Sequence, residues 1–288
     1  MLRVAILGTG NIGTDLLFKV RRSGLLKCSF FVGRRQDSPG LQRAKSMGIS
    51  ALPGGLEELK VHLSNVDLVF DATSAADHLI HAGILLEAGC HVINLTPAPL
   101  GEFFVPGVTD ISQGEMTEPK NLNMITCGGQ TTVPFVSRLM HAFESVRSVE
   151  IASTLSSSSA GPATRRNLDE YIANTERGIT SLTGAASAKA MLVLNPAKPE
   201  IMMHTSVYMA GTGLSISAAK TETSTVLENM RAYVPGISMT SEPKVLGPDL
   251  LHFSIGVEGA GDYLPKHAGN LDIINVAAIR AAEELAEK

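Results

Sequence analysis

With 288 residues, 44% of them hydrophobic and 18% charged, the chain can form about two domains with sizeable cores, which excludes a disordered protein. A net charge of −4 gives no electrostatic basis for binding nucleic acid, and no apolar run approaches the roughly 20 residues of a membrane span. Three cysteines, an odd number in a long chain, and an N-terminus without a signal-peptide pattern predict a cytoplasmic protein with reduced thiols.

The first part of the chain alternates strands with helices. Leu2 to Leu7 is a short apolar run typical of a buried parallel strand, and a helical pattern follows from about Ile12 to Arg22. Further strands are expected at "KCSFFVGR", "VDLVFDAT" and "CHVINLTP", and further helices at "SPGLQRAKSMG" and "AADHLIHAGILLEAG". This alternation, which continues to about residue 127, predicts a doubly wound α/β domain of the Rossmann type over residues 1–127.

A glycine motif lies between the first strand and the first helix. Its six residues fit the pattern G-x-G-x-x-G and are Gly8, Thr9, Gly10, Asn11, Ile12 and Gly13. The glycines permit a tight turn, close approach of a pyrophosphate and close packing of helix on strand, and the helix N-terminus favours phosphate. Because the motif follows a strand and opens a helix, it predicts a dinucleotide-binding site.

The end of the second strand should distinguish NAD from NADP. An acidic residue there would hold the ribose hydroxyl, whereas an arginine accommodates a 2′-phosphate. The sequence has Arg34 and Arg35 at this place, followed by Asp37. The arginines favour NADP or use of both cofactors, while Asp37 leaves NAD open.

The second part of the chain has a different texture. Longer alternating strands are expected at "VRSVEIASTLS", "KAMLVLNP", "EIMMHTSVYMA", "GISMTSEPKVL" and "LLHFSIGVEGA". Polar helices are expected near 167–180 and 224–233, which indicates an α+β domain with an antiparallel sheet over residues 128–266. The amphipathic segment 267–288 should form a helix that packs back on the first domain.

Cys127 stands at a junction between a strand and a helix, between Thr126 and the pair Gly128 and Gly129. A helix N-terminus lowers the pKa of a thiol, and backbone N–H groups there can receive an oxyanion. The glycines would let a substrate approach. Cys127 is therefore the candidate nucleophile for oxidation of an aldehyde through a thioester, although a buried structural cysteine is the alternative.

Several motifs give the chain a resemblance to a known family over nearly its whole length. They are "VAILGTGNIGTDL", "VFDATSA", "INLTPA", "NMITCGGQTT", "SSSSAGPATRRNLDEY", "YVPG", "VEGA" and "YLP" followed by "AGNLDI". With these motifs the chain resembles the acylating acetaldehyde dehydrogenases, the partners of 4-hydroxy-2-oxovalerate aldolase in the catabolism of aromatic compounds.

The resemblance implies a second domain like that of glyceraldehyde-3-phosphate dehydrogenase, a homo-oligomer such as a dimer, and an aldolase partner. It implies that Cys127 carries the acyl group before transfer to coenzyme A. It also implies cofactor contacts at Thr9 to Ile12 and, outside the glycine motif, at Ser159, Ala160, Gly161, Pro162, Ala163, Thr164, Arg165, Arg166, Asn167 and Asn270. From the residues themselves, Arg34 after the second strand and Thr73 and Ser74 at the end of a strand at the cofactor edge are further candidate contacts, although Asp71 to Ser74 could instead cap a helix. From the residues alone, the serine-rich loop could be a surface turn and Asn270 a helix cap.

Two departures from the family pattern affect this interpretation. The family's aspartate, proposed as the base or its orienting group, aligns with Thr205, which leaves the neighbouring His204 as a candidate base. The region between "YVPG" and "VEGA" is also shorter than in the family. The sequence therefore leaves undecided whether the chain has the family's interface with the aldolase. His78 and His81 share a helix face but have no further ligand in view, so we expect no metal site.

We therefore expect an acylating aldehyde dehydrogenase that converts a short aldehyde, NAD or NADP, and coenzyme A to an acyl-coenzyme A. Acetaldehyde is the favoured substrate, and a related aldehyde is the alternative. Two other functions stay open: a semialdehyde dehydrogenase with a different acceptor, and a non-catalytic, cofactor-binding subunit of an aldolase complex.

Overall fold

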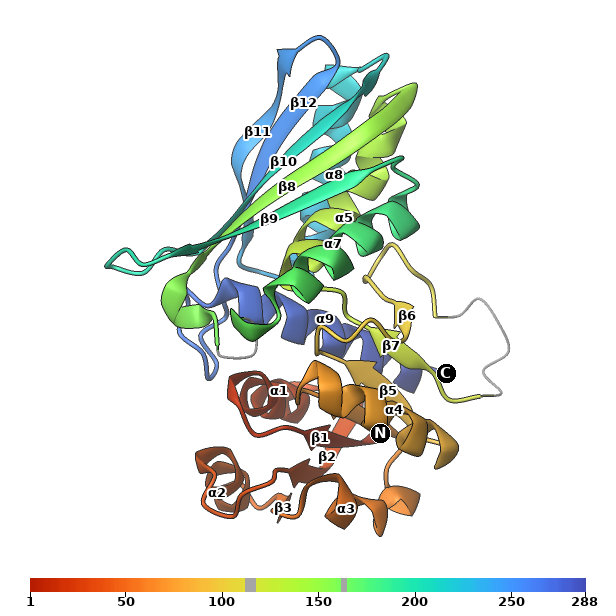
Figure 1. Cartoon of the computed structure of the whole chain (residues 1–288), viewed down its shortest axis with the longest axis vertical. Helices are drawn as coiled ribbons and strands as arrows, with labels where there is room; N and C mark the ends of the chain where they lie inside the picture. The colour runs from red at the N-terminus through yellow and green to blue at the C-terminus, as the bar shows by residue number, and fades with distance from the viewer. Residues whose placement is uncertain (112–117, 162–164) are drawn as a thin grey trace. The chain divides into compact units, whose positions relative to one another are not determined.

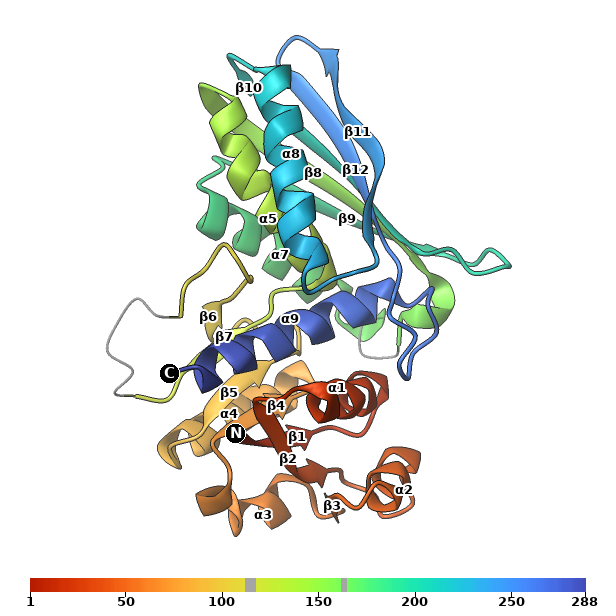
Figure 2. The same cartoon turned by 180° about the vertical axis from the view of Figure 1, so that it is seen from behind.

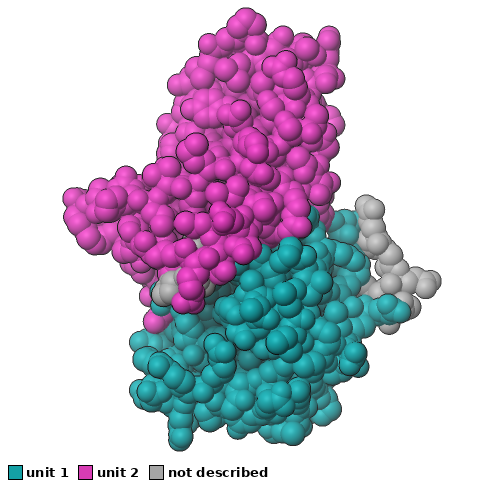
Figure 3. Space-filling model, in the orientation of Figure 1, with its two compact units in different colours: residues 1–104, 110–124, 275–288 teal, residues 105–109, 125–274 magenta. Residues whose placement is uncertain are grey.

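The computed structural model describes residues 1–111, 118–161 and 165–288, which form two compact units (Figure 3). Unit 1 comprises Met1–Phe104, Asp110–Met124 and Asn275–Lys288. Unit 2 comprises Val105–Thr109 and Ile125–Ile274. Neither unit is one continuous stretch of chain, and each is described separately below.

Unit 1 is built on a seven-stranded parallel sheet with the strand order β3-β2-β1-β4-β5-β7-β6 (Figure 1). The strands are β1 (Leu2–Leu7), β2 (Leu26–Val32), β3 (Ser50–Leu52), β4 (Leu68–Asp71), β5 (His91–Asn94), β6 (Glu102–Phe103) and β7 (Asn121–Asn123). The strand order reverses between β1 and β4, and the first domain is therefore the doubly wound α/β domain that the sequence predicts.

The helices of unit 1 bury apolar stripes against this sheet. They are α1 (Asn11–Arg22), α2 (Pro39–Ser46), α3 (Gly55–Lys60), α4 (Ala75–Glu87) and the part of α9 (Gly269–Ala286) from Asn275 onward, with a short 3₁₀ turn, η1 (Leu63–Asn65). Leu16, Leu17 and Val20 of α1 are fully buried at helical spacing, and Phe31 and Phe70 fill the sheet core. The sequence did not reveal β3, α3 and β6, because they are too short for a periodic pattern.

Unit 2 is built on a five-stranded sheet with the strand order β11-β12-β10-β8-β9. The strands are β8 (Ser145–Ser156), β9 (Ala188–Asn195), β10 (Met203–Thr212), β11 (Ile237–Gly247) and β12 (Leu250–Val257). The expectation of an antiparallel sheet is wrong for one pair, because β8 and β9 run parallel while the other pairs are antiparallel. The sheet is mixed because α7 (Leu168–Thr183) returns the chain between β8 and β9.

Three helices cover one face of this sheet: α5 (Cys127–Leu139), α7 and α8 (Ile216–Arg231) (Figures 1 and 2). The 3₁₀ turns η2 (Met140–Ala142) and η3 (Ser157–Ser159) also belong to this unit. α8 begins and ends earlier than the helix expected over 224–233. No helix in the described ranges is long and apolar enough to span a bilayer.

Candidate functional site

The glycine loop of unit 1 depends on close backbone contacts. Gly8 has φ +119°, and a Cβ atom built on it would lie 2.5 Å from the carbonyl oxygen of Ala72, just after β4. A Cβ atom on Gly13 would lie 1.9 Å from the carbonyl oxygen of Gly8. Any larger residue at either position would therefore displace backbone.

Gly10 differs from these two glycines, because a Cβ atom built on it meets nothing within 4 Å. Gly10 is also the N-cap of α1 and makes no side-chain capping bond. The first turn of an α-helix has N–H groups without intrahelical partners, and the helix dipole favours negative charge there. The open space at Gly10 and the uncapped end of α1 therefore fit a dinucleotide pyrophosphate.

The residues beyond β2 are largely exposed. The Arg34 side chain is 77% exposed, with its guanidinium 3.5 Å from a carboxylate oxygen of Asp77 on α4. Ser38, before α2, donates a hydrogen bond of 2.8 Å to the hydroxyl oxygen of Thr9 in the glycine loop. Arg34 is thus free to turn toward a phosphate, whereas the side chain of Thr9 already has a partner.

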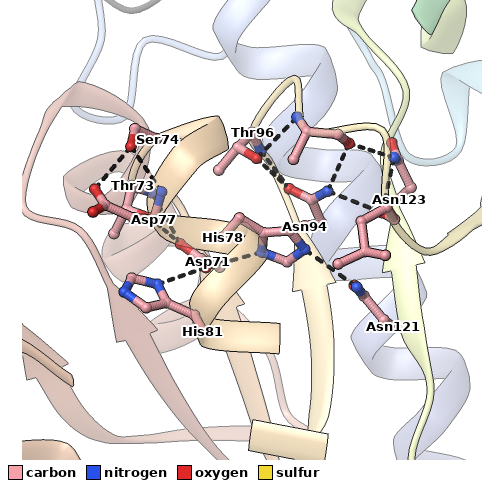
Figure 4. Close-up of polar contacts among 12 residues, drawn as sticks. Asp71, Thr73, Ser74, Asp77, His78, His81, Asn94, Thr96, Asn121 and Asn123 are labelled. Carbon is pink, nitrogen blue, oxygen red and sulfur yellow. Dashed lines mark hydrogen bonds and ion pairs between the residues drawn. The ribbon is translucent and has the colours of Figure 1, made fainter. Parts of the chain in front are cut away.

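A polar network follows β4 at the carboxyl edge of the sheet (Figure 4). The hydroxyl and backbone N–H of Thr73 both donate to Oδ1 of Asp71. Ser74 caps α4 by accepting from the N–H of Asp77 and hydrogen-bonds the carboxylate of Asp77 as well. The side chains of Thr73 and Ser74 are therefore engaged within the protein, which leaves backbone groups to meet a cofactor at these predicted positions.

Asp71 also binds two histidines that the sequence left without a partner. Nδ1 of His78 and Nδ1 of His81 lie 2.9 and 3.0 Å from Oδ2 of Asp71, and Asp71 and His78 are fully buried. Nε2 of His78 lies 3.2 Å from the amide nitrogen of Asn121. Burial raises the pKa of Asp71, but the hydrogen bonds from His78, His81 and Thr73 outweigh it and bring the pKa to about 2.

A second network shapes the loop after β5. Oδ1 of Asn94 accepts from the hydroxyl and N–H of Thr96. The amide groups of Asn94 and Asn123 both donate to the carbonyl oxygens of Ala98 and Leu100. Asn94 and Asn123 therefore fix this loop at the edge where parallel sheets bind ligands, a role that strand periodicity could not reveal.

Cys127 is the first residue of α5 and lies in unit 2. Thr126 caps the helix, since its hydroxyl oxygen accepts a 3.0 Å hydrogen bond from the N–H of Gly129. The sulfur of Cys127 lies 3.3 Å from the hydroxyl oxygen of Tyr171 on α7, and the N–H of Gly128 donates to that same oxygen over 3.1 Å. Only 8% of the Cys127 surface is exposed.

The electrostatics of this thiol differ from the expectation drawn from a helix end. Burial raises the pKa of Cys127, and the hydrogen bonds from Tyr171 and the N–H of Gly128 offset that rise only in part. The N–H groups of Gly128 and Gly129, expected to receive an oxyanion, are bonded to Tyr171 and Thr126. The N-terminus of α5 therefore acts on the sulfur both directly, through the backbone N–H groups of Cys127 and Gly128, and through Tyr171.

Tyr171 is the functional candidate that sequence reasoning missed. It lies 44 residues beyond Cys127 and is the last residue of the family-like motif "SSSSAGPATRRNLDEY", in which cofactor contacts were expected only as far as Asn167. The contact depends on Gly128, since a Cβ atom built there would lie 2.8 Å from the tyrosine hydroxyl oxygen. The sequence thus held two signals for this contact, Gly128 beside the cysteine and the tyrosine at the end of the motif.

The structure gives no support to His204 as the base for Cys127. Met203 and Thr205 are buried on the face of β10 toward α5, whereas His204 alternates onto the other face. Thr205, the position of the family aspartate, is fully buried and its hydroxyl is 2.9 Å from that of Ser153 on β8. A neutral pair of hydroxyls therefore occupies this position.

The serine-rich loop follows β8. The hydroxyl of Ser159 donates to the carbonyl oxygen of Ser156, and the guanidinium of Arg165 binds the carbonyl oxygens of Ser157 and Ala160. A pocket at the carboxyl ends of β8 and β9 is lined by Ser156, Ser157, Ser158, Asn195, Pro196, Ala197 and Lys198. Of the other predicted contacts here, Gly161, Arg166 and Asn167 are described, whereas Pro162, Ala163 and Thr164 lie outside the described residues.

Asn270, in the first turn of α9, is 3% exposed, and its Oδ1 atom has no hydrogen-bond partner among the described residues. A buried amide oxygen without a donor is costly, and it fits the N–H₂ group of a nicotinamide carboxamide. The described predicted residues thus divide between the units. Gly8 to Gly13, Arg34, Thr73 and Ser74 belong to unit 1, and Cys127, the serine-rich loop and Asn270 belong to unit 2.

The chain is similar to known proteins over nearly its whole length. Residues 127–265 match the family model described as prokaryotic acetaldehyde dehydrogenase, dimerisation. An acetaldehyde dehydrogenase from Spirochaeta aurantia is 47% identical over 286 residues, which cover 99% of this chain and 95% of that protein. One from Bacillus cereus is 42% identical over 288 residues, which cover 99% and 94%.

A solved structure shares the fold at low sequence identity. It is aspartate semialdehyde dehydrogenase II from Vibrio cholerae in complex with ASA, with a TM-score of 0.68 and 14% identity. The match covers 100% of this chain and 99% of that one. It confirms the expected fold class, a parallel Rossmann-type sheet with a second, α+β domain, whose sheet is mixed.

Proposed function

The chain belongs to the prokaryotic acetaldehyde dehydrogenase family, and we propose that it oxidises acetaldehyde, or a related short aldehyde, to the coenzyme A thioester. The hydride acceptor in this proposal is NAD or NADP. The observation that carries the proposal is the position of Cys127 as the first residue of α5, with its sulfur hydrogen-bonded by a tyrosine hydroxyl group. The relatives named above are acetaldehyde dehydrogenases, which supports an aldehyde as the substrate.

In the proposed reaction the thiolate of Cys127 attacks the carbonyl carbon of the aldehyde. A carbon–sulfur bond forms, and the carbonyl π electrons move to the oxygen. The nicotinamide, when bound, accepts the hydride from this carbon. Cys127 then carries the acyl group as a thioester until the thiolate of coenzyme A takes the acyl group and releases the Cys127 thiolate. The thiol proton of coenzyme A is the one proton released overall.

The residues of unit 1 that would hold the dinucleotide are those of the glycine loop. Gly8 and Gly13 shape the turn, Gly10 leaves space for the pyrophosphate, and the uncapped N-terminus of α1 favours its charge. Arg34 would bind a 2′-phosphate, which would extend use to NADP. In unit 2, Oδ1 of Asn270 would accept from the carboxamide.

The proposal includes a homodimer, since the matched family model covers a dimerisation region at residues 127–265. It also includes an aldolase partner, following the family resemblance. β11 and β12 are joined by a tight turn at Pro248 and Asp249, so the part of this chain that is shorter than in the family is a hairpin. Cys28, Cys90 and Cys127 are free thiols, in keeping with the reducing cytoplasm that we expect.

The test is formation of NADH or NADPH from acetaldehyde, with and without coenzyme A, for the wild type, Cys127→Ala and the matched control Cys28→Ala. We expect turnover that requires coenzyme A, is lost in Cys127→Ala and is kept in Cys28→Ala. Turnover that persists in Cys127→Ala would exclude the covalent mechanism. Turnover that needs only water or phosphate would identify a different acceptor.

A further inference from the structure

Among the residues that the structure describes, the side-chain partner of the Cys127 sulfur is a phenol and not a carboxylate or an imidazole. Its pKa is affected by burial, by Tyr171 and by backbone N–H groups, and no charged side chain in the described ranges contributes. Tyr171 is itself 8% exposed. The thiol is thus enclosed with one neutral side-chain partner within hydrogen-bond distance.

The direction of the hydrogen bonds can be worked out from the groups involved. A backbone N–H can only donate, so the Gly128 N–H occupies a lone pair of the Tyr171 hydroxyl oxygen over 3.1 Å. The hydroxyl proton is then available for the sulfur, which lies 3.3 Å away. A thiolate has no proton, so in that state the hydroxyl must be the donor. The order of donation is Gly128 N–H to Tyr171 O–H to Cys127 sulfur.

We propose that Tyr171 stabilises the thiolate of Cys127, because its hydroxyl group donates a hydrogen bond to the sulfur and transmits to it the positive end of α5. The inference rests on the proposed function, in which this sulfur is the nucleophile. Tyr171 is then a neutral hydrogen-bond donor to the Cys127 sulfur. The neighbouring hydroxyl groups of Thr205 and Ser153 supply no negative charge at this site. A hydrogen bond to an ionised group is stronger than one to its neutral form, so the bond favours thiolate over thiol.

Tyr171 cannot instead act as the base that removes the thiol proton. Burial and the neighbouring Cys127 raise the pKa of its phenol well above the usual value, so the hydroxyl keeps its proton in the working pH range. The proton of Cys127 must therefore leave to solvent or to the incoming reactants. The reactivity of Cys127 should therefore depend on a single ionisation, that of its own thiol group.

The position of the Tyr171 hydroxyl is held by a second set of bonds between α5 and α7. The Gly129 N–H donates to the Thr126 hydroxyl, which lies 2.7 Å from the hydroxyl of Thr175. Thr175 in turn donates to the backbone carbonyl of Tyr171 over 2.7 Å. The two helices are therefore joined beside the sulfur, and the phenol has little freedom to turn away.

The test is the pH dependence of alkylation of Cys127 by iodoacetamide, followed at the Cys127 peptide by mass spectrometry, in Tyr171→Phe and wild type. Loss of the hydroxyl donor in Tyr171→Phe should move the midpoint of the curve of alkylation rate against pH to higher pH by about one unit or more. At a fixed pH below the midpoint, alkylation should then be about tenfold slower. Access to the sulfur changes the limiting rate at high pH and leaves the midpoint unchanged. Tyr208→Phe is the matched control, since the Tyr208 ring packs on His252 on the far face of the sheet.

A second variant tests the same bond with the phenol retained. Gly128→Ala places a methyl group 2.8 Å from the Tyr171 hydroxyl oxygen and should displace it, with a shift of the midpoint in the same direction. Midpoints in both variants equal to the wild type, with folding verified by circular dichroism, would overturn the inference. Aldehyde oxidation is scored separately. A shifted midpoint in an enzyme without coenzyme-A-dependent turnover would refute the function alone, and an unshifted midpoint in an active enzyme would refute only the role of Tyr171.

Discussion

Replacing Asp71 with asparagine should remove a pH-dependent part of the stability of unit 1. The carboxylate is fully buried and accepts hydrogen bonds from His78, His81 and Thr73 (Figure 4). Its pKa is lowered in the folded protein from 3.8 to about 2. A lowered folded-state pKa gives stability that is fully present above the unfolded-state pKa and is lost as the pH falls through the folded-state value.

The size of the effect follows from these two pKa values. Compared with neutral pH, protonation of Asp71 should lower the free energy of unfolding of the wild type by about 1 kcal/mol at pH 3 and by about 2 kcal/mol at pH 2. Asparagine does not titrate, so this loss should be missing from Asp71→Asn. The wild type should therefore be the more stable protein at pH 7, by an advantage that shrinks in acid.

The assay is urea unfolding at a fixed protein concentration at pH 7, 5, 4 and 3. Far-UV circular dichroism is the appropriate signal, because the chain has no tryptophan. Asp37→Asn is the matched control, since that carboxylate is 80% exposed and its ion pair is with the similarly exposed Arg35. Free energies of unfolding that fall in parallel for wild type and Asp71→Asn between pH 7 and pH 3 would refute the role assigned to the buried carboxylate.

Three further variants test the glycine loop and the cofactor site. Gly13→Ala should destabilise the protein by about 3 kcal/mol in urea unfolding, because its Cβ atom would lie 1.9 Å from the Gly8 carbonyl oxygen. Gly10→Ala should change stability by less than about 0.5 kcal/mol, since its Cβ atom meets nothing and its φ of −75° suits alanine. It should nevertheless raise the KM for NAD about tenfold, equivalent to about 1.4 kcal/mol, and an unchanged KM would argue against a pyrophosphate at Gly10. Arg34→Ala should raise the KM for NADP about tenfold and leave that for NAD nearly unchanged. Equal effects on both cofactors would contradict a 2′-phosphate contact.

Local chemistry explains what the sequence predicted correctly. A glycine motif between an apolar strand and a helix depends only on nearby residues, so the β1–α1 turn could be predicted. The same holds for Cys127 at a helix start, where Thr126 is an ordinary N-cap.

Features that depend on distant contacts could not be predicted in this way. Strand periodicity does not determine the direction of a neighbouring strand, and the parallel pairing of β8 with β9 was therefore missed. Two histidines on one helix face give no sign of a buried carboxylate on another element, as with His78 and Asp71. The pKa of Cys127 was expected to fall because the helix end is visible in sequence, whereas burial is not.

The helix α9 has a consequence for the order in which the protein can fold during synthesis. Asn275 donates to the buried carboxylate of Asp15, and the hydroxyl of Ser23 bonds to Glu283, so α1 and the last helix are joined within unit 1. Four alanines of this helix are completely buried: Ala277, Ala278, Ala281 and Ala282. A nascent chain that has released only residues 1–124 therefore lacks part of its first core, and this unit can be completed only after α9 has left the ribosome.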